Sequence, residues 1–236
     1  MITKIYRKAF AVVLKKPLIL WGIVMLNALL TGVVTFLFGA VPGIALGINL
    51  ALSTSMTLIF LKGYRGEEVH CVDLFGCLKD FQTAKRVILG MLWMTLWIFI
   101  WGLIPIVGPI FAIIKSYSYR LTPYILTLEP EVKITDAIHV SENRTTGYRA
   151  QMFGADFLVY VIYFVVVLVL GWFAGITADV EIISHFFSFI IAIISIVFVA
   201  LVPLFVGLVQ SAFYEEIMAK HNTGAPSEEP VNNDAQ

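Results

Sequence analysis

The chain has 236 residues, of which 59% are hydrophobic and only 14% are charged, and its mean hydropathy is +0.90. This composition excludes an ordinary soluble domain and indicates a multi-pass, all-α membrane protein. The 16 basic and 16 acidic residues balance to a net charge of zero, and the basic residues are not gathered into a groove, so no nucleic-acid partner is predicted.

Residues 1 to 17 are predicted to form a basic amphipathic helix. Apolar side chains recur there at helical spacing, and Lys4, Lys8 and Lys15 lie on the opposite side. We expect the helix to lie on the inner leaflet and to bind anionic lipids. A cleavable signal peptide is the competing interpretation, but the apolar run that follows is too long and lacks a convincing small-residue cleavage site.

Six apolar segments in residues 18 to 219 are predicted to cross the bilayer, because a helix of about 20 apolar residues spans the hydrocarbon core. The last segment is too long for one upright span, and Pro203 is expected to kink it. The polar tail, residues 220 to 236, is predicted to be disordered. The six predicted spans cover residues 18–38, 43–61, 87–103, 110–128, 153–176 and 182–214.

Small residues recur at every fourth position around the start of the second span. Such a stripe lets helix backbones approach closely, so we predict tight packing against either another span or a second copy of the chain. The stripe consists of Gly39, Gly43, Gly47, Ala51 and Ser55.

The polar segment between the second and third spans contains apolar residues at helical spacing from Asp73 to Phe81. This pattern predicts an interfacial helix, with a helix that docks a partner protein as the alternative. Cys71 and Cys77 are the only cysteines, and no second pair of ligands with zinc-type spacing accompanies them. We therefore predict no metal site and no cofactor.

The fourth span carries two cations, Lys115 and Arg120, where lipid is expected. Ionisable side chains cost a few kcal/mol in a bilayer core, so the polar face of this helix is predicted to point into protein or water. Pro123 lacks an N–H and is expected to kink the helix. Asp156 lies near the start of the fifth span, about one helical turn inside the membrane boundary. We predict that it pairs with Arg120.

These residues and the tyrosines beside them form a predicted intramembrane polar cluster. It is interpreted either as a polar pocket or pathway, or as a structural arrangement in which Arg120 is an internal staple and the Lys115 side chain extends outward to lipid headgroups. The cluster consists of Lys115, Tyr117, Tyr119, Arg120, Tyr124 and Asp156.

The basic residues also predict the topology. Outside the fourth span, every Lys and Arg lies in residues 1–16, 62–86 or 133–149, or at Lys220. Basic residues concentrate in cytoplasmic loops, so these segments and both termini are placed in the cytoplasm. The six spans then form three hairpins, with amphipathic segments at the interface.

Several motifs together resemble one bacterial membrane family. They are YRGEE (Tyr64 to Glu68), DLFGCLKDF (Asp73 to Phe81), IIKSYSYRLTPYILTLEP (Ile113 to Pro130), AIHVSENRTTG (Ala137 to Gly147) and SAFYEEI (Ser211 to Ile217). The chain resembles the integral-membrane family catalogued as domain of unknown function nine-seven-five. It is more distantly similar to the membrane domains of some glycerophosphodiester phosphodiesterases. The resemblance implies a bacterial plasma-membrane protein without an established activity, and Arg120 departs from the small residues usual at that position.

No P-loop, nucleophile elbow or convergent carboxylate pair occurs, so catalysis is not predicted. The expected function is a non-catalytic membrane scaffold or accessory protein that binds lipids, a partner membrane protein or a second copy of itself. The alternative is a transporter or channel for a small anionic solute or lipid headgroup, with Lys115 and Arg120 binding the anion. A third hypothesis is a lipid-modifying enzyme that uses the tyrosines and cations.

Overall fold

The computed structural model describes residues 2–15, 17–177 and 180–223, and in these ranges every regular element is a helix. The predicted basic helix is present as α1, and residues 1 and 16 lie outside the described ranges. Of the predicted tail, residues 224–236 also lie outside them, whereas residues 220–223 continue the last helix and are not disordered. The elements are α1 (Ile2–Lys15), α2 (Pro17–Phe38), α3 (Pro42–Arg65), the 3-10 helix η1 (Cys71–Leu78), α4 (Phe81–Gly102), α5 (Gly108–Ser118), α6 (Thr122–Leu128), α7 (Ala137–Thr145), α8 (Arg149–Ile176) and α9 (Glu181–Thr223).

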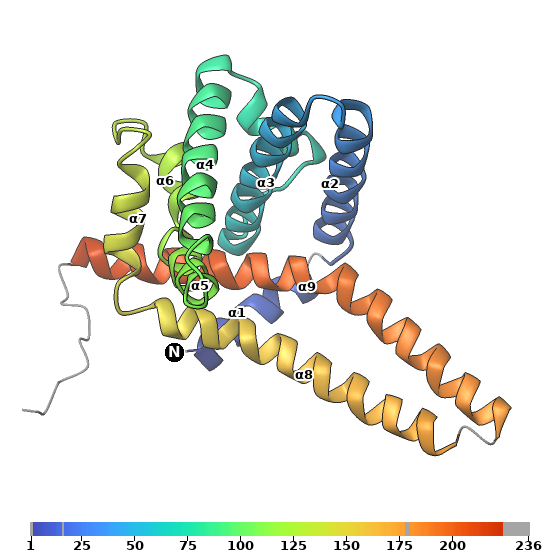
Figure 1. Ribbon diagram of the computed structural model, residues 1–236. Coiled ribbons are helices and arrows are strands. Elements are labelled where there is room, and N and C mark those ends of the chain that lie inside the picture. Colours follow the sequence, from blue (N-terminus) through green and yellow to red (C-terminus); the bar gives the residue numbers. More distant parts are fainter. Residues whose placement is uncertain (1, 16, 178–179, 224–236) are drawn as a thin grey trace, which may run out of the picture.

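Five helices are long and apolar enough to cross a membrane, namely α2, α3, α4, α8 and α9. They match five of the six predicted spans, and the last is a 43-residue helix that continues through Pro203 and bends along its length (Figure 1). The prediction of one helix over residues 110–128 is wrong. The chain leaves the helix after Ser118 and starts α6 at Thr122, with Pro123 in the first turn, where a missing N–H costs no hydrogen bond.

The helices form two groups that meet at one core. Figure 1 shows α2, α3 and α4 standing side by side, while α8 and α9 form a long hairpin that passes beneath them and projects to one side. The core lies where α9 meets α3 and α6, with α4 packed against those two helices, and its largest fully buried side chains include Ile59, Tyr124, Leu126 and Phe213. The C-terminal helix therefore packs against the N-terminal half of the chain.

The apolar face of α1 packs on α9 and is not free for lipid. Ile5 and Ala9 are buried, and the Tyr6 ring lies 5.4 Å from the Phe205 ring. Lys8, on the other face, is exposed. Lys4 and Arg7 are exposed as well, so these three cations lie away from the buried face, as the amphipathic pattern predicts.

In the part of the chain that the structure describes, the far half of the α8–α9 hairpin is covered only by its own two helices (Figure 1). Tyr163 stacks on Phe198 with a ring distance of 3.9 Å, and its hydroxyl lies 3.0 Å from the Ser195 hydroxyl. Outward-facing residues such as Phe164 and Phe189 remain exposed. Apolar surface of this extent is typical of helices that contact lipid or another membrane protein.

The predicted small-residue stripe is only partly a packing surface. Gly39 lies in the turn before α3, and a Cβ added at Gly43 would meet nothing within 4 Å. Further along, a Cβ at Gly47 would lie 3.3 Å from Ile88 of α4, and Ser55 accepts the Cys77 N–H at 3.1 Å. Gly47 and Ser55 therefore pack against α4 and η1 of the same chain.

The segment predicted as one interfacial helix over Asp73 to Phe81 is two elements. It begins within η1, which ends at Leu78, and it ends at the first residue of α4. Asp80 separates the two by accepting the Thr83 N–H at 2.8 Å, which caps α4. At the start of η1, the Asp73 carboxylate accepts the His70 N–H at 3.0 Å and lies 3.2 Å from the Lys62 ammonium.

Two glycines outside the stripe lie at close contacts between helices. A Cβ at Gly207 of α9 would overlap the Phe60 ring of α3, and a Cβ at Gly90 of α4 would lie 2.5 Å from Leu126 of α6. Both glycines therefore set how closely the N-terminal helices approach their partners in the core.

We expect Gly207→Ala to destabilise the fold by about 1 to 3 kcal/mol, because the added methyl group forces the Phe60 ring to move within a packed core. The measurement is the free energy of unfolding in detergent micelles titrated with sodium dodecyl sulfate. Gly22→Ala is the matched control, since nothing lies within 4 Å of a Cβ there. Equal effects of the two substitutions would contradict the close α3–α9 contact.

A second prediction concerns acid. The His70 N–H hydrogen bond, aided by the nearby Lys62 ammonium, holds the pKa of Asp73 below its usual value. The carboxylate therefore stabilises the fold above the unfolded-state pKa of about 4, and this contribution is lost as the pH falls through the lowered pKa. Asp73→Asn should cost about 1 kcal/mol at neutral pH.

The difference in thermal midpoint between Asp73→Asn and the parent protein should then narrow below about pH 4. Thermal unfolding in detergent from pH 7 to pH 3 checks this. A difference that stays constant across that range would show that Asp73 is not the titrating group.

Candidate functional site

Arg120 lies in the short link between α5 and α6 and forms an ion pair with Asp156 of α8. Its Nη1 atom is 2.6 Å from Asp156 Oδ2, and the two side chains are only 13% and 11% exposed. The pairing predicted from the sequence is therefore present. Because the link is not helical, Arg120 is not part of the continuous helical face that the sequence pattern predicts.

Two further side chains complete the surroundings of this pair. The Tyr117 hydroxyl donates to Asp156 Oδ2 at 3.1 Å, and the Tyr117 ring lies 4.9 Å from the guanidinium carbon. The Gln210 amide, with its oxygen turned to the guanidinium, accepts from Nη2 and, at 3.0 Å, from Nε of Arg120. We call Tyr117, Arg120, Asp156 and Gln210 the Arg120 cluster. Each charge in it has a partner, as a buried ion pair requires.

The backbone of the α5–α6 link is satisfied by side chains of α7. Ser141 accepts the Leu121 N–H at 3.1 Å and donates to the Ser118 carbonyl at 2.8 Å. Thr145 donates to the same carbonyl at 3.0 Å. Buried backbone groups that leave a helix must find such partners, so α7 stabilises the break that positions Arg120.

Lys115 has its own carboxylate and does not join Arg120. Its ammonium is 2.6 Å from Glu142 Oε1 of α7 and lies 5.4 Å from the Trp101 ring. Both charged side chains are largely covered, at 20% and 25% exposed. Lys115 therefore does not extend outward to lipid headgroups. This differs from one of the two interpretations of the sequence. Glu142 is not predicted as the partner of Lys115, because it lies in an amphipathic segment that the sequence places at the membrane interface.

The remaining tyrosines of the predicted cluster contribute mainly to packing. The Tyr124 ring is fully buried and stacks on Tyr214 at 4.3 Å, and its hydroxyl lies 3.3 Å from the Ser211 hydroxyl. Tyr119 is buried too, with its ring 5.7 Å from the Lys115 ammonium. The six predicted residues thus divide into the Arg120 cluster, the Lys115 ion pair and the core.

Water access to the Arg120 cluster differs on its two sides. On the side of Leu121, Tyr124 and Phe213, which we call the inner side, the space next to the pair has no room for a water molecule. On the other side, an open depression of about 320 Å³ between α4 and α5 reaches the pair. We call it the outer depression. A small molecule could enter it, but it would meet an ion pair that is already neutral.

Among the described residues, no three His, Cys, Asp or Glu side chains are grouped so that they could hold a metal ion. Cys71 is exposed and Cys77 is buried, and they are not bridged. Comparison of the chain with protein-family models, curated proteins and solved structures finds no match. Its function must therefore be argued from its own residues.

Removing one charge of the Arg120 cluster should destabilise the fold by about 3 to 5 kcal/mol, because the other charge is left buried without a partner. We expect Arg120→Gln and Asp156→Asn each to show this loss. The double variant should be more stable than the sum of the single losses predicts. A double-mutant cycle on free energies of unfolding in detergent measures the coupling.

The control for this cycle is the exposed ion pair between Arg65 and Glu215, whose side chains are 42% and 34% exposed. Its coupling energy should be no more than about 1 kcal/mol, because exposed pairs gain little. Additive losses at Arg120 and Asp156 would contradict the role of their pairing in the fold.

Proposed function

We propose that this chain is a non-catalytic scaffold of the bacterial plasma membrane, in which the Arg120 cluster is a structural joint. The observation that carries the proposal is the 2.6 Å ion pair between Arg120 and Asp156, closed to water on its inner side. The pair links the α5–α6 break to α8, and Gln210 extends the link to α9. The polar groups of the Arg120 cluster already have partners within the chain.

Charge neutralisation argues against anion transport. A site that binds an anion needs positive charge that is not already compensated, and here each cation faces its own carboxylate within 2.6 Å. An incoming anion would have to displace Asp156 from Arg120 or Glu142 from Lys115. Leaving either carboxylate buried and unpaired would be costly.

The proposed topology retains six crossings and keeps both termini in the cytoplasm. Five helices have the length of a span, and the sixth crossing would be made by α5 and α6 together. If these two short helices did not cross, the basic segment 133–149 would lie outside, against the positive-inside tendency. A broken crossing is tolerated in a membrane where its backbone is buried in protein. Ser141 and Thr145 of α7 satisfy the backbone of this break from the cytoplasmic segment, so the break would lie near that end of the crossing.

The far half of the α8–α9 hairpin remains apolar and uncovered. Such a scaffold would offer this surface to lipid or to a partner membrane protein. The resemblance to a bacterial family of integral-membrane proteins agrees with this setting. It adds no activity to the proposal.

The outer depression favours a second candidate function, a transporter or channel for a small anionic solute or lipid headgroup. It brings open space to Arg120 and Ser116. Transport through this site would require a continuous aqueous route past the ion pair, which the closed inner side lacks. Water access on the two sides of the pair therefore distinguishes the two functions.

Single cysteines in a Cys71→Ser, Cys77→Ser background test this distinction. Ser116→Cys lies in the outer depression, whereas Leu121→Cys and Val209→Cys lie on the inner side, where the parent residues are 1% and 2% exposed. With a membrane-impermeant thiol reagent applied to either face of sealed vesicles, we expect labelling of Ser116→Cys from one face only. Leu121→Cys and Val209→Cys should stay unlabelled from both faces.

Ile106→Cys in the α4–α5 turn is the positive control, because Ile106 is 94% exposed. Labelling of the two inner positions at a rate close to that of Ile106→Cys would show an aqueous route. That result would contradict the scaffold proposal and support the transporter.

A further inference from the structure

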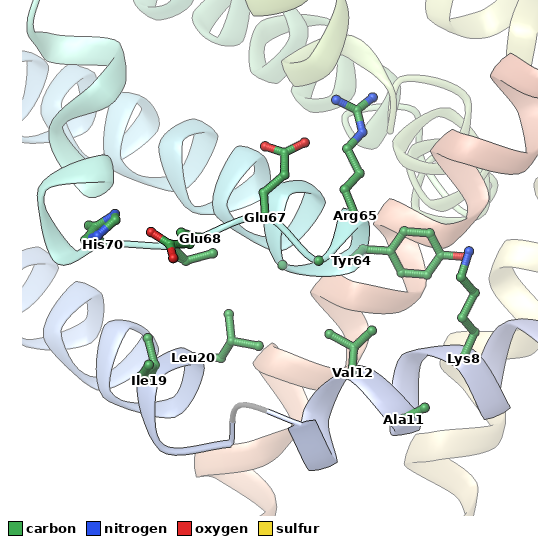
Figure 2. A pocket seen from close by; sticks show the side chains of 13 residues that line it. Lys8, Ala11, Val12, Ile19, Leu20, Tyr64, Arg65, Glu67, Glu68 and His70 are labelled. Carbon is green, nitrogen blue, oxygen red and sulfur yellow. The ribbon is translucent and has the colours of Figure 1, made fainter.

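A cavity of about 570 Å³ lies away from the Arg120 cluster, between α1, the start of α2 and the end of α3. Figure 2 shows its two walls. Lys8 and Val12 of α1 and Leu20 of α2 form one wall, and Tyr64 and Glu68, at the end of α3 and in the loop after it, form the other. The cavity is within the size range of sites that hold small ligands.

Opposite charges stand at the two ends of this cavity. The Lys8 ammonium lies over the Tyr64 ring, 4.4 Å from its centre, and forms no ion pair with a described residue. Glu68 lies toward the opposite end, beside His70 (Figure 2). Glu68, too, has no ion-pair partner among the described residues. The cavity thus offers one cation and one anion that the fold leaves uncompensated.

The other two charged residues of the lining are directed elsewhere. Figure 2 shows the side chains of Arg65 and Glu67 pointing away from α1 and α2. Arg65 is held there by Glu215, at 2.7 Å between Nε and Oε1. Lys8 and Glu68 are therefore the charges that a ligand in the cavity would meet.

The wall formed by α1 and α2 is apolar, with Ala11, Val12, Ile19 and Leu20 along it. Here a basic amphipathic helix joins a helix long enough to cross the membrane. The end of a membrane-spanning helix lies where lipid headgroups meet the hydrocarbon. A ligand that combines a charged head with an apolar body suits this position.

We propose that this cavity binds a phospholipid that carries a primary amine, with its phosphate at Lys8 and its ammonium at Glu68. A primary ammonium donates hydrogen bonds to a carboxylate, whereas a quaternary ammonium is recognised mainly by aromatic rings. An anionic lipid without an amine would place negative charge near Glu68 and gain nothing there. The apolar wall receives the first carbons of the acyl chains.

This site shares no residue with the Arg120 cluster, so its test is independent of the scaffold proposal. The full-length chain, purified and delipidated in detergent, is titrated with dioleoyl phosphatidylethanolamine, and bound lipid is measured by native mass spectrometry. Binding should saturate at one lipid, with an affinity at least about tenfold above that for phosphatidylcholine or phosphatidylglycerol, one tenfold step being about 1.4 kcal/mol.

Lys8→Gln and Glu68→Gln should each remove this preference. Glu67→Gln, the same substitution on the neighbouring residue that points away from the cavity, should leave it unchanged. All three parent side chains are exposed, so the variants should keep the thermal midpoint of the lipid-free protein.

Three results would overturn the proposal. Equal binding of all three lipids would show adventitious annular lipid only. Tighter binding of phosphatidylglycerol that depends on Lys8 but not on Glu68 would show a simple anion site. Soluble phosphoethanolamine that competes at the same concentration as the lipid would show that the ligand is a free phosphorylated amine.

Discussion

The pairing of Arg120 with Asp156 is the constraint on which the membrane part of this structure depends. A charge shielded from water needs a partner, and a guanidinium has more donors than one carboxylate can accept. Gln210 and Tyr117 supply the remaining contacts, so residues from α5, the α5–α6 link, α8 and α9 converge on one point. The relative positions of these elements are therefore fixed by polar contacts as well as by apolar packing.

The broken helix between α5 and α6 depends on a second set of polar contacts. Ser141 and Thr145 of α7 occupy the backbone groups that the break exposes, and Glu142, between them in sequence, takes the charge of Lys115. One face of the nine-residue helix α7 therefore hydrogen-bonds the backbone of the break and also pairs with the Lys115 side chain. The sequence places this amphipathic segment at the membrane interface, whereas in the structure it packs into the helical core.

Much of this fold follows from local sequence patterns. Long apolar runs predict the five full-length spans, because hydropathy is summed over neighbouring residues. The Arg120–Asp156 pair is predictable from the cost of two lone charges in apolar segments. The break at residues 119–121 is not, since Pro123 predicts a kink and the partners of the break come from α7. The contact of Gln210 with Arg120 is not predictable either, because it depends on where α9 packs.

The position of α9 in the core has a consequence for how the protein is made. Helices emerge from the ribosome in order, and Leu208, Gln210 and Phe213 belong to the last of them. Until α9 is synthesised, Phe60 lacks the helix that packs on it and Arg120 lacks its amide partner. Until α9 is made, the earlier helices therefore remain incompletely packed and accessible to chaperones and proteases.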